Sequence, residues 1–307
     1  MNHLCGLPNI AGNPIDTLLE LGEREALATF KASYMEHADA NDAVPIWALT
    51  KEAVEALPAS GWRALDDVTL LRFLRADKRR DGFDHAKSMD RLLAALAWRK
   101  KTNSDLLLAL PADDDYEHLR IRRWVGADKH GRPVQFERLG EFLCSGNAKA
   151  FTADEWLRHY ARDLETTFAE MRQASLACGR PVTKYLFVGD FQGGSGVVFH
   201  MSTVVPLLKM LTKSVEAHFP EIVDKILIFN APRIFATMFQ VVKAFMDPIT
   251  AAKVEVYAGV PTGRLLALMD SSTLPVEYGG TNAAPYPLAR VFTPRAALRP
   301  ASGVHRP

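Results

Sequence analysis

The chain has 307 residues, of which 48% are hydrophobic and 24% are charged. This balance is typical of a folded globular protein and argues against a disordered, collagen-like or membrane-spanning chain. The 37 basic and 36 acidic residues nearly cancel, which argues against the strongly basic surface of a dedicated nucleic-acid-binding protein. The length allows one large domain with extensions or two ordinary domains.

Cysteine usage and the N-terminus indicate a reducing compartment. Cys5, Cys144 and Cys178 are an odd number without short paired spacing, which supports neither a disulfide framework nor a zinc site. The N-terminus lacks a basic segment followed by an apolar run, as a secretory signal would have. We therefore expect a cytoplasmic protein without metal or cofactor, and with peripheral membrane contact at most.

Charge divides the chain into four segments. Residues 1–60 are acidic and are expected to form a mostly helical extension, whereas bases outnumber acids over 61–101, within a helical module expected over 61–125. Residues 126–280 form the main domain. Residues 281–307 contain several arginines and prolines but no acidic residue, which is typical of a disordered basic tail.

Hydrophobic periodicity predicts the elements in chain order. Apolar residues at three- and four-residue steps predict amphipathic helices around 70–74 and 86–97. The turn-rich segment 128–133 leads into a predicted strand over 134–139. From there helices and strands alternate, which predicts an α/β domain with helical crossovers: helices over 152–177, 197–218 and 234–246, and strands over 184–189, 225–229 and 254–257.

The turn Gly193-Gly194-Ser195-Gly196 lies between a predicted strand and a predicted helix. Its glycine spacing fits neither a dinucleotide-binding nor a Walker loop, and Val197 stands where a nucleophile elbow needs glycine. A lipid ester hydrolase that uses Ser195 is a distant alternative. We expect no catalytic residue and no enzyme.

Two neighbouring segments leave their interpretation open. Residues 234–246 form an unusually apolar helix, which fits a buried crossover helix or a mobile lid over a lipid cavity. In the segment that follows, Thr250 and Lys253 share a face if Pro248 opens a short helix. A hydroxyl and an ammonium there can clamp a phosphate, although a capped surface helix is the plainer interpretation of the spacing alone.

Together these segments resemble the CRAL-TRIO lipid-binding family, most closely its phosphatidylinositol-transfer branch. The resemblance covers roughly 65–280. It rests on the order and spacing of several motifs: Leu70-Leu71-Arg72-Phe73-Leu74-Arg75-Ala76, Trp98-Arg99-Lys100, Asp128 to Leu139, His218-Phe219-Pro220-Glu221, Asn230-Ala231-Pro232, Phe245-Met246-Asp247-Pro248 and Leu274 to Gly280.

The resemblance implies a helical N-terminal bundle packed on an α/β domain, whose mixed sheet floors an apolar lipid cavity closed by a mobile gate helix. Headgroup-binding residues of the family match Glu221, Thr250 and Lys253, and a further basic contact maps to Lys78 or Arg80. The lysine and threonine can donate to phosphate or inositol oxygens, and the glutamate can accept from inositol hydroxyls. The gate residues are Phe235, Met238, Phe239, Val242, Phe245 and Met246.

One departure from the family concerns the cavity strand. Tyr185 and Phe187 stand where members that also carry phosphatidylcholine have small hydroxyl residues. This argues against a choline lipid and leaves a flatter hydrophobic molecule, such as a sterol, as an alternative second ligand.

The resemblance implies a monomeric carrier that exchanges phosphatidylinositol at membrane surfaces, with a lipid kinase as a further partner. Such a carrier neither makes nor breaks a covalent bond. At about 0.8 kcal/mol per CH₂, acyl chains need a closed apolar pocket. Two alternatives remain: a carrier of a sterol, retinoid or tocopherol-like ligand, and an adaptor that uses the acidic N-terminus for protein contacts.

Overall fold

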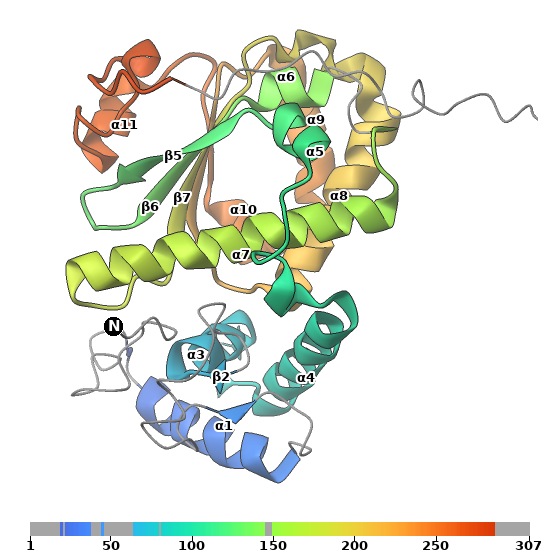
Figure 1. Cartoon of the computed structure of the whole chain (residues 1–307), viewed down its shortest axis with the longest axis vertical. Coiled ribbons are helices and arrows are strands. Elements are labelled where there is room, and N and C mark those ends of the chain that lie inside the picture. Colours follow the sequence, from blue (N-terminus) through green and yellow to red (C-terminus); the bar gives the residue numbers. More distant parts are fainter. Residues whose placement is uncertain are drawn as a thin grey trace, which may run out of the picture.

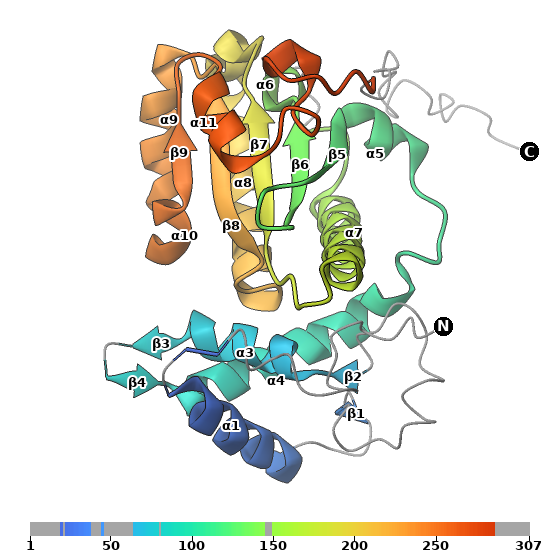
Figure 2. The ribbon, with the colours of Figure 1, turned by 90° about the vertical axis from the view of Figure 1, so that its left-hand side faces the viewer.

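The computed structural model describes residues 19–20, 22–37, 44–45, 64–79, 81–144 and 149–285, and Arg80 and residues 286–307 lie outside this part. The described residues form a helical module beneath an α/β domain (Figures 1 and 2). The elements of the module are α1 (Glu23–His37), α3 (Asp67–Ala76) and α4 (His85–Thr102), with the short strand pairs β1 (Val44–Pro45) and β2 (Ala64–Leu65), and β3 (Lys78–Arg79) and β4 (Gly82–Phe83).

Aspartates begin the two helices that the apolar pattern predicts in the module. Asp66 accepts a hydrogen bond from the backbone N–H of Thr69, and Asp84 accepts one from that of Lys87, which satisfies amides that a helix leaves unpaired at its start. The apolar faces of α1, α3 and α4 then pack together. Their buried side chains include Phe30, Tyr34, Leu70, Phe73 and Leu92.

The α/β domain is built on a five-stranded mixed sheet in the order β5-β6-β7-β8-β9. β5 is antiparallel to β6, and the remaining neighbours are parallel. The strands are β5 (Arg122–Ala127), β6 (Pro133–Glu137), β7 (Tyr185–Asp190), β8 (Val223–Phe229) and β9 (Val254–Val256). The predicted mixed α/β architecture is confirmed, with β5 as a strand that the sequence analysis missed.

Helices cover both faces of the sheet (Figures 1 and 2). α11 lies on one face, where Leu186 and Val188 of β7 are buried, whereas Phe187 packs toward the helices of the opposite face. The helical elements are η3 (Ser104–Leu106), α5 (Asp114–Leu119), α6 (Leu139–Cys144), α7 (Ala153–Cys178), η5 (Gly194–His200), α8 (Met201–His218), α9 (Arg233–Lys243), α10 (Pro248–Ala252), α11 (Thr262–Leu268) and η6 (Val276–Tyr278).

The turn between β5 and β6 explains one of the sequence motifs. The Asp128 carboxylate accepts hydrogen bonds from the backbone N–H groups of His130 and Arg132. Gly131 has a φ of 75°, and a Cβ atom there would lie 2.5 Å from the sulfur of Cys178. Glycine is therefore required at this position by both backbone conformation and space.

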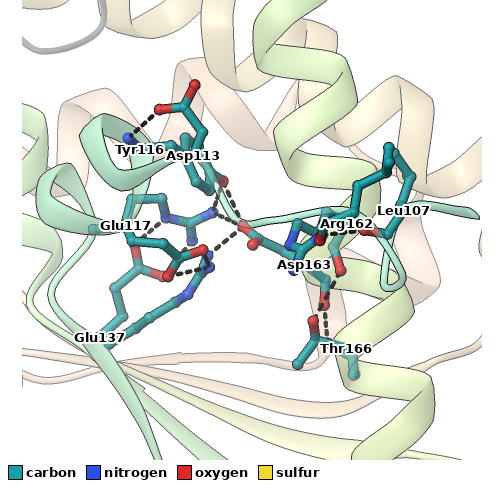
Figure 3. Close-up of polar contacts among 12 residues, drawn as sticks. Leu107, Asp113, Tyr116, Glu117, Glu137, Arg162, Asp163 and Thr166 are labelled. Atoms are coloured by element: carbon teal, nitrogen blue, oxygen red, sulfur yellow. Dashed lines mark hydrogen bonds and ion pairs between the residues drawn. The ribbon is translucent and has the colours of Figure 1, made fainter.

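A buried polar network joins α5, β5, β6 and α7 (Figure 3). Arg120 donates to Glu137 through Nε at 2.7 Å and to Asp163 through Nη1 at 2.6 Å. The Tyr116 hydroxyl also donates to Asp163, and Arg122 pairs with the same carboxylate. Because buried charges are tolerated only when they are paired and hydrogen-bonded, this network fixes α7 against the sheet.

Polar and aromatic contacts join the helical module to the α/β domain. Arg99 of α4 pairs with Glu165 of α7 at 2.6 Å, and both side chains are buried. Arg72 donates to the carbonyl of Thr183 at 2.8 Å. Trp98 stacks on His218 at the end of α8, with ring centroids 4.3 Å apart. The module is therefore packed firmly against the domain.

The stacked histidine predicts a pH dependence of stability. Burial and the nearby Arg99 lower the pKa of His218 from 6.5 to about 4. The unfolded chain therefore binds a proton here between pH 6.5 and 4 that the folded protein does not, so the free energy of unfolding falls as the pH drops through this window. We expect His218 to contribute about 1–2 kcal/mol to this fall, because its ring is only half-buried.

Urea unfolding at pH 7 and pH 4.5 tests this expectation. His218→Phe, which keeps a ring against Trp98, should lose less stability on acidification than the wild type does. His130→Phe in the exposed turn serves as the control and should behave like the wild type. Equal acid sensitivity of wild type and His218→Phe would contradict the assignment.

Candidate functional site

Glu221, Thr250 and Lys253, which the sequence predicts as a headgroup site, all line one cavity of about 430 Å³. The parallel strands bring them together. Glu221 precedes β8 and Lys253 precedes β9, and these two strands pair in parallel. Residues that precede neighbouring parallel strands meet at one edge of a sheet, so the two side chains lie next to each other although they are far apart in the sequence.

Local sequence positions each of these residues. Asp247 caps α10 by accepting hydrogen bonds from the backbone N–H groups of Ile249 and Thr250, and Pro248 occupies the first turn, as the sequence predicts for a short helix. Glu221 has a φ of 57° in the tight turn before β8. This left-handed conformation is uncommon for a residue with a side chain.

The carboxylate of Glu221 lies between two lysines. Both of its oxygens are 3.4 Å from Nζ of Lys253, and Oε2 is 3.1 Å from Nζ of Lys184. Burial raises the pKa of Glu221, but the two ammonium groups outweigh this effect and hold it below the usual value. Burial lowers the pKa of Lys253, and Glu221 opposes that shift. The group formed by Glu221, Lys184 and Lys253 thus carries one positive charge in excess, while Glu216 and Asp247 add two carboxylates to the cavity wall.

Arg91 of α4 is a cavity-lining cation that the sequence analysis missed. Asp77, whose side chain is fully buried, holds it through two hydrogen bonds of 2.8 and 2.9 Å. A third bond of 2.9 Å runs to the carbonyl of Glu216. These bonds use three of the five N–H donors of the guanidinium. The Asp77-to-Arg91 distance in the sequence carries no signal that could have identified this pair.

Lys78, the predicted N-terminal contact, does not line the cavity. Its side chain is 40% exposed and pairs with Glu20 at 2.8 Å. It belongs to the hairpin of β3 and β4, which directs it to the surface of the helical module. The alternative, Arg80, lies outside the described residues.

The gate residues divide into two groups. Phe245 and Met246, which follow the end of α9, line the cavity. Phe235 is buried against Phe191 at 4.8 Å between ring centroids and stacks on Phe239. Val242 is partly buried, and the side chain of Met238 lies outside the described part. In this conformation α9 is therefore anchored through its first turns, while the residues after its end line the cavity.

The two aromatic residues of the cavity strand occupy different surroundings. Tyr185 lines the cavity together with Tyr160 of α7 and apolar side chains. Phe187 faces the same side of the sheet and packs against the apolar cluster that contains Phe235. Only Tyr185 of this pair therefore contacts the cavity space. The apolar residues of the cavity wall include Leu164, Val215, Ile222, Val223 and Ile226.

The described part of the chain gives little support for catalysis at Ser195, for a metal site or for a membrane-spanning helix. Ser195 is exposed on η5, and among the described residues no histidine or carboxylate bonds to it. Within the same part, no cluster of three or more His, Cys, Asp or Glu side chains could hold a metal ion. None of the helices described there combines the length and apolarity needed to span a membrane.

Comparison with known proteins relates the chain to a family. The model of the CRAL/TRIO domain matches residues 120–280. The chain is 31% identical over 216 residues to the phosphatidylinositol/phosphatidylcholine transfer protein SFH9 of Arabidopsis thaliana, an alignment that covers 69% of the chain. It is 29% identical over 269 residues to the SEC14 cytosolic factor of Candida glabrata, which covers 82% of the chain and 86% of that relative.

Coverage differs among these relatives. The chain spans 36% of the length of SFH9 and 36% of that of a second Arabidopsis transfer protein, SFH4. Among solved structures, the crystal structure of Sfh5 superposes with a TM-score of 0.66 at 17% identity, over 86% of the chain and 90% of that structure. This likeness confirms the predicted fold.

The ion pair of Glu221 with Lys253 predicts a change in the pKa of Lys253 that can be measured without a ligand. In Glu221→Gln the attraction that opposes the burial of Lys253 is lost while the repulsion from Lys184 remains, so the pKa of Lys253 should fall by about one unit or more. NMR titration of the lysine side chains measures this pKa. Glu117→Gln, a variant distant from the cavity, should leave it unchanged, and an unshifted Lys253 in Glu221→Gln would show that the pair contributes little.

Proposed function

The chain belongs to the CRAL/TRIO domain family, and on this premise we propose that it binds a phosphatidylinositol-type lipid and exchanges it at membrane surfaces. The observation that carries the proposal is the convergence of Glu221, Thr250 and Lys253 on one cavity that apolar side chains also line. The names of relatives such as SFH9 and SFH4 as phosphatidylinositol/phosphatidylcholine transfer proteins agree with it.

The headgroup chemistry follows from the side chains present. Lys253 and the Thr250 hydroxyl donate to phosphate oxygens, and Glu221 accepts from inositol hydroxyls. In the unliganded protein, Glu221 neutralises Lys253. A bound phosphate takes over part of that role, and Glu221 then becomes available to the sugar hydroxyls while Lys184 keeps it ionised.

Sheltering the acyl chains is the second requirement. Burying each CH₂ group contributes about 0.8 kcal/mol, so a lipid leaves a bilayer readily only if the protein offers a comparable apolar environment. Phe245 and Met246 line the cavity after the end of α9, and their displacement would admit the chains. The protein thus acts as a cytoplasmic, monomeric carrier that makes or breaks no bond, and it presents its lipid to membrane-bound enzymes such as lipid kinases.

Native mass spectrometry with lipid extraction tests this function. The protein is incubated with vesicles that contain phosphatidylinositol and phosphatidylcholine, and the bound lipid is identified. Wild type should retain phosphatidylinositol, and Lys253→Ala should retain at least tenfold less, because a charge-assisted hydrogen bond contributes about 1.5–3 kcal/mol. Lys225→Ala, which removes a lysine paired with Glu255 away from the cavity, is the matched control.

The outcome also separates the alternatives. Retention of a sterol or another neutral lipid by wild type and Lys253→Ala alike, with no phosphatidylinositol, would assign the protein to a carrier of neutral hydrophobic ligands. Absence of any lipid from the wild type would favour the adaptor.

A second prediction concerns the cation supplied by the helical module. Because Arg91 lines the cavity and Lys78 does not, Arg91→Met should weaken phosphatidylinositol binding about tenfold. Lys78→Met should leave binding within twofold of the wild type. Vesicle-based transfer assays with labelled phosphatidylinositol measure both variants, and thermal unfolding verifies that Arg91→Met remains folded. A larger loss of binding in Lys78→Met than in Arg91→Met would instead assign the basic contact to Lys78.

A further inference from the structure

Two tyrosine hydroxyls in the cavity lack the partners that other tyrosines have. Tyr160 of α7 and Tyr185 of β7 both line the cavity, and within the described part of the chain neither hydroxyl forms a hydrogen bond. By contrast, three other tyrosine hydroxyls each donate to a carboxylate: Tyr116, Tyr257 and Tyr278. Both residues are partly exposed and neither hydroxyl is fully buried, so each can donate to a ligand in the cavity.

The surroundings of this pair are electrically balanced. Burial raises the pKa of Tyr160 to about 12 and that of Tyr185 above its usual value, so both phenols stay protonated. Arg120, whose guanidinium carbon lies 5.7 Å from the Tyr160 ring centroid, is already matched by Glu137 and Asp163. The pair therefore offers neutral hydrogen-bond donors, which can bond to an uncharged acceptor such as a carbonyl without leaving a charge unpaired in the cavity.

The position of the pair identifies that acceptor. The backbone N–H of Tyr185 donates to the carbonyl of Ile222 at 3.0 Å, and Ile222 directly follows Glu221, so the pair adjoins the charged group. Apolar side chains such as Leu164 and Val215 line the same cavity. In a diacyl phospholipid, the polar atoms between the phosphodiester and the chains are those of the two esters.

We propose that Tyr160 and Tyr185 form a second polar subsite, which donates hydrogen bonds to an ester carbonyl of the bound lipid. This inference deepens the proposed phosphatidylinositol function and rests on it for the identity of the lipid. It assigns the cavity two chemically distinct parts: a charged group that reads the headgroup, and a neutral tyrosine pair that reads the linkage between glycerol and chain. An ether-linked lipid of the same headgroup and chain length fits the first part and leaves the second unsatisfied.

The test compares diester phosphatidylinositol with its diether analogue, which lacks both carbonyls. Affinities are measured by competition in native mass spectrometry for the wild type and for the double variant Tyr160→Phe/Tyr185→Phe. We expect the wild type to prefer the diester about tenfold or more and the double variant to bind both lipids within about twofold of each other. Tyr257→Phe removes a hydroxyl that bonds to Glu255 outside the cavity and should keep the preference of the wild type.

Two further arms separate this inference from the headgroup site. Lys253→Ala should weaken the binding of the diester and of the diether equally, so the ratio of the two affinities should not change. Diacylglycerol and dialkylglycerol, which carry no headgroup, test the tyrosine pair alone. The wild type could bind neither the diester nor the diether phosphatidylinositol and still prefer diacylglycerol to dialkylglycerol. In that case the proposed function is wrong and the tyrosine subsite is supported.

The inference is overturned if the double variant keeps the ester preference, or if the wild type shows none in either pair of lipids. Because Tyr→Phe preserves the ring, packing is little disturbed. Each single variant is measured as well, so that loss of the preference in a folded single variant supports the subsite even if the double variant is unstable.

Discussion

Parallel pairing of β7, β8 and β9 is the constraint on which the candidate site depends. Each strand of such a sheet starts at the same edge, and the residues just before or at these starts are Lys184 and Tyr185, Glu221, and Lys253. A crossover helix between each pair of strands separates these residues by more than thirty positions in the chain. Only the sheet brings an acid, two lysines and a tyrosine to one place.

The helical module contributes a further side chain to the cavity at this edge of the sheet. α4 packs against α8 and carries Arg91 to the cavity, where buried Asp77 holds its guanidinium. The paired contacts of Arg99 with Glu165 and of Trp98 with His218 keep α4 in register with the α/β domain. The module is thus part of the binding site, and loosening its contacts would displace a cation as well as lower stability.

Two groups of charged side chains in the α/β domain are paired with opposite charges. Arg120 is matched by Glu137 and Asp163, and Glu221 at the edge of the cavity is matched by two lysines. The first group uses its hydrogen bonds within the protein and fixes α7. The second lies at the cavity that Thr250 also lines. The tyrosine pair lies in the same cavity and carries no charge, so a lipid meets polar groups of different kinds within one space.

The sequence by itself determined the elements and much of the site. Hydrophobic periodicity located α3, α4 and α7, strand patterns located β6 to β9, and family motifs led to Glu221, Thr250 and Lys253, because these features depend on residues close together in the chain. Their role in binding a headgroup stays a prediction. The sequence did not indicate β5, which has no clear alternation, or Lys184 as a partner of Glu221.

Tertiary structure alone decided which cation of the helical module and which of the predicted gate residues line the cavity. Lys78 and Arg91 are both basic residues of amphipathic segments, and only the packing of α4 on α8 shows that Arg91 points to the cavity while Lys78 pairs with Glu20. Likewise, all gate residues share one apolar pattern, but the end of α9 at Lys243 places Phe245 and Met246 at the cavity and leaves Phe235 in the core. Local pattern sets which side chains are apolar or charged, whereas their partners depend on contacts between segments that are distant in the chain.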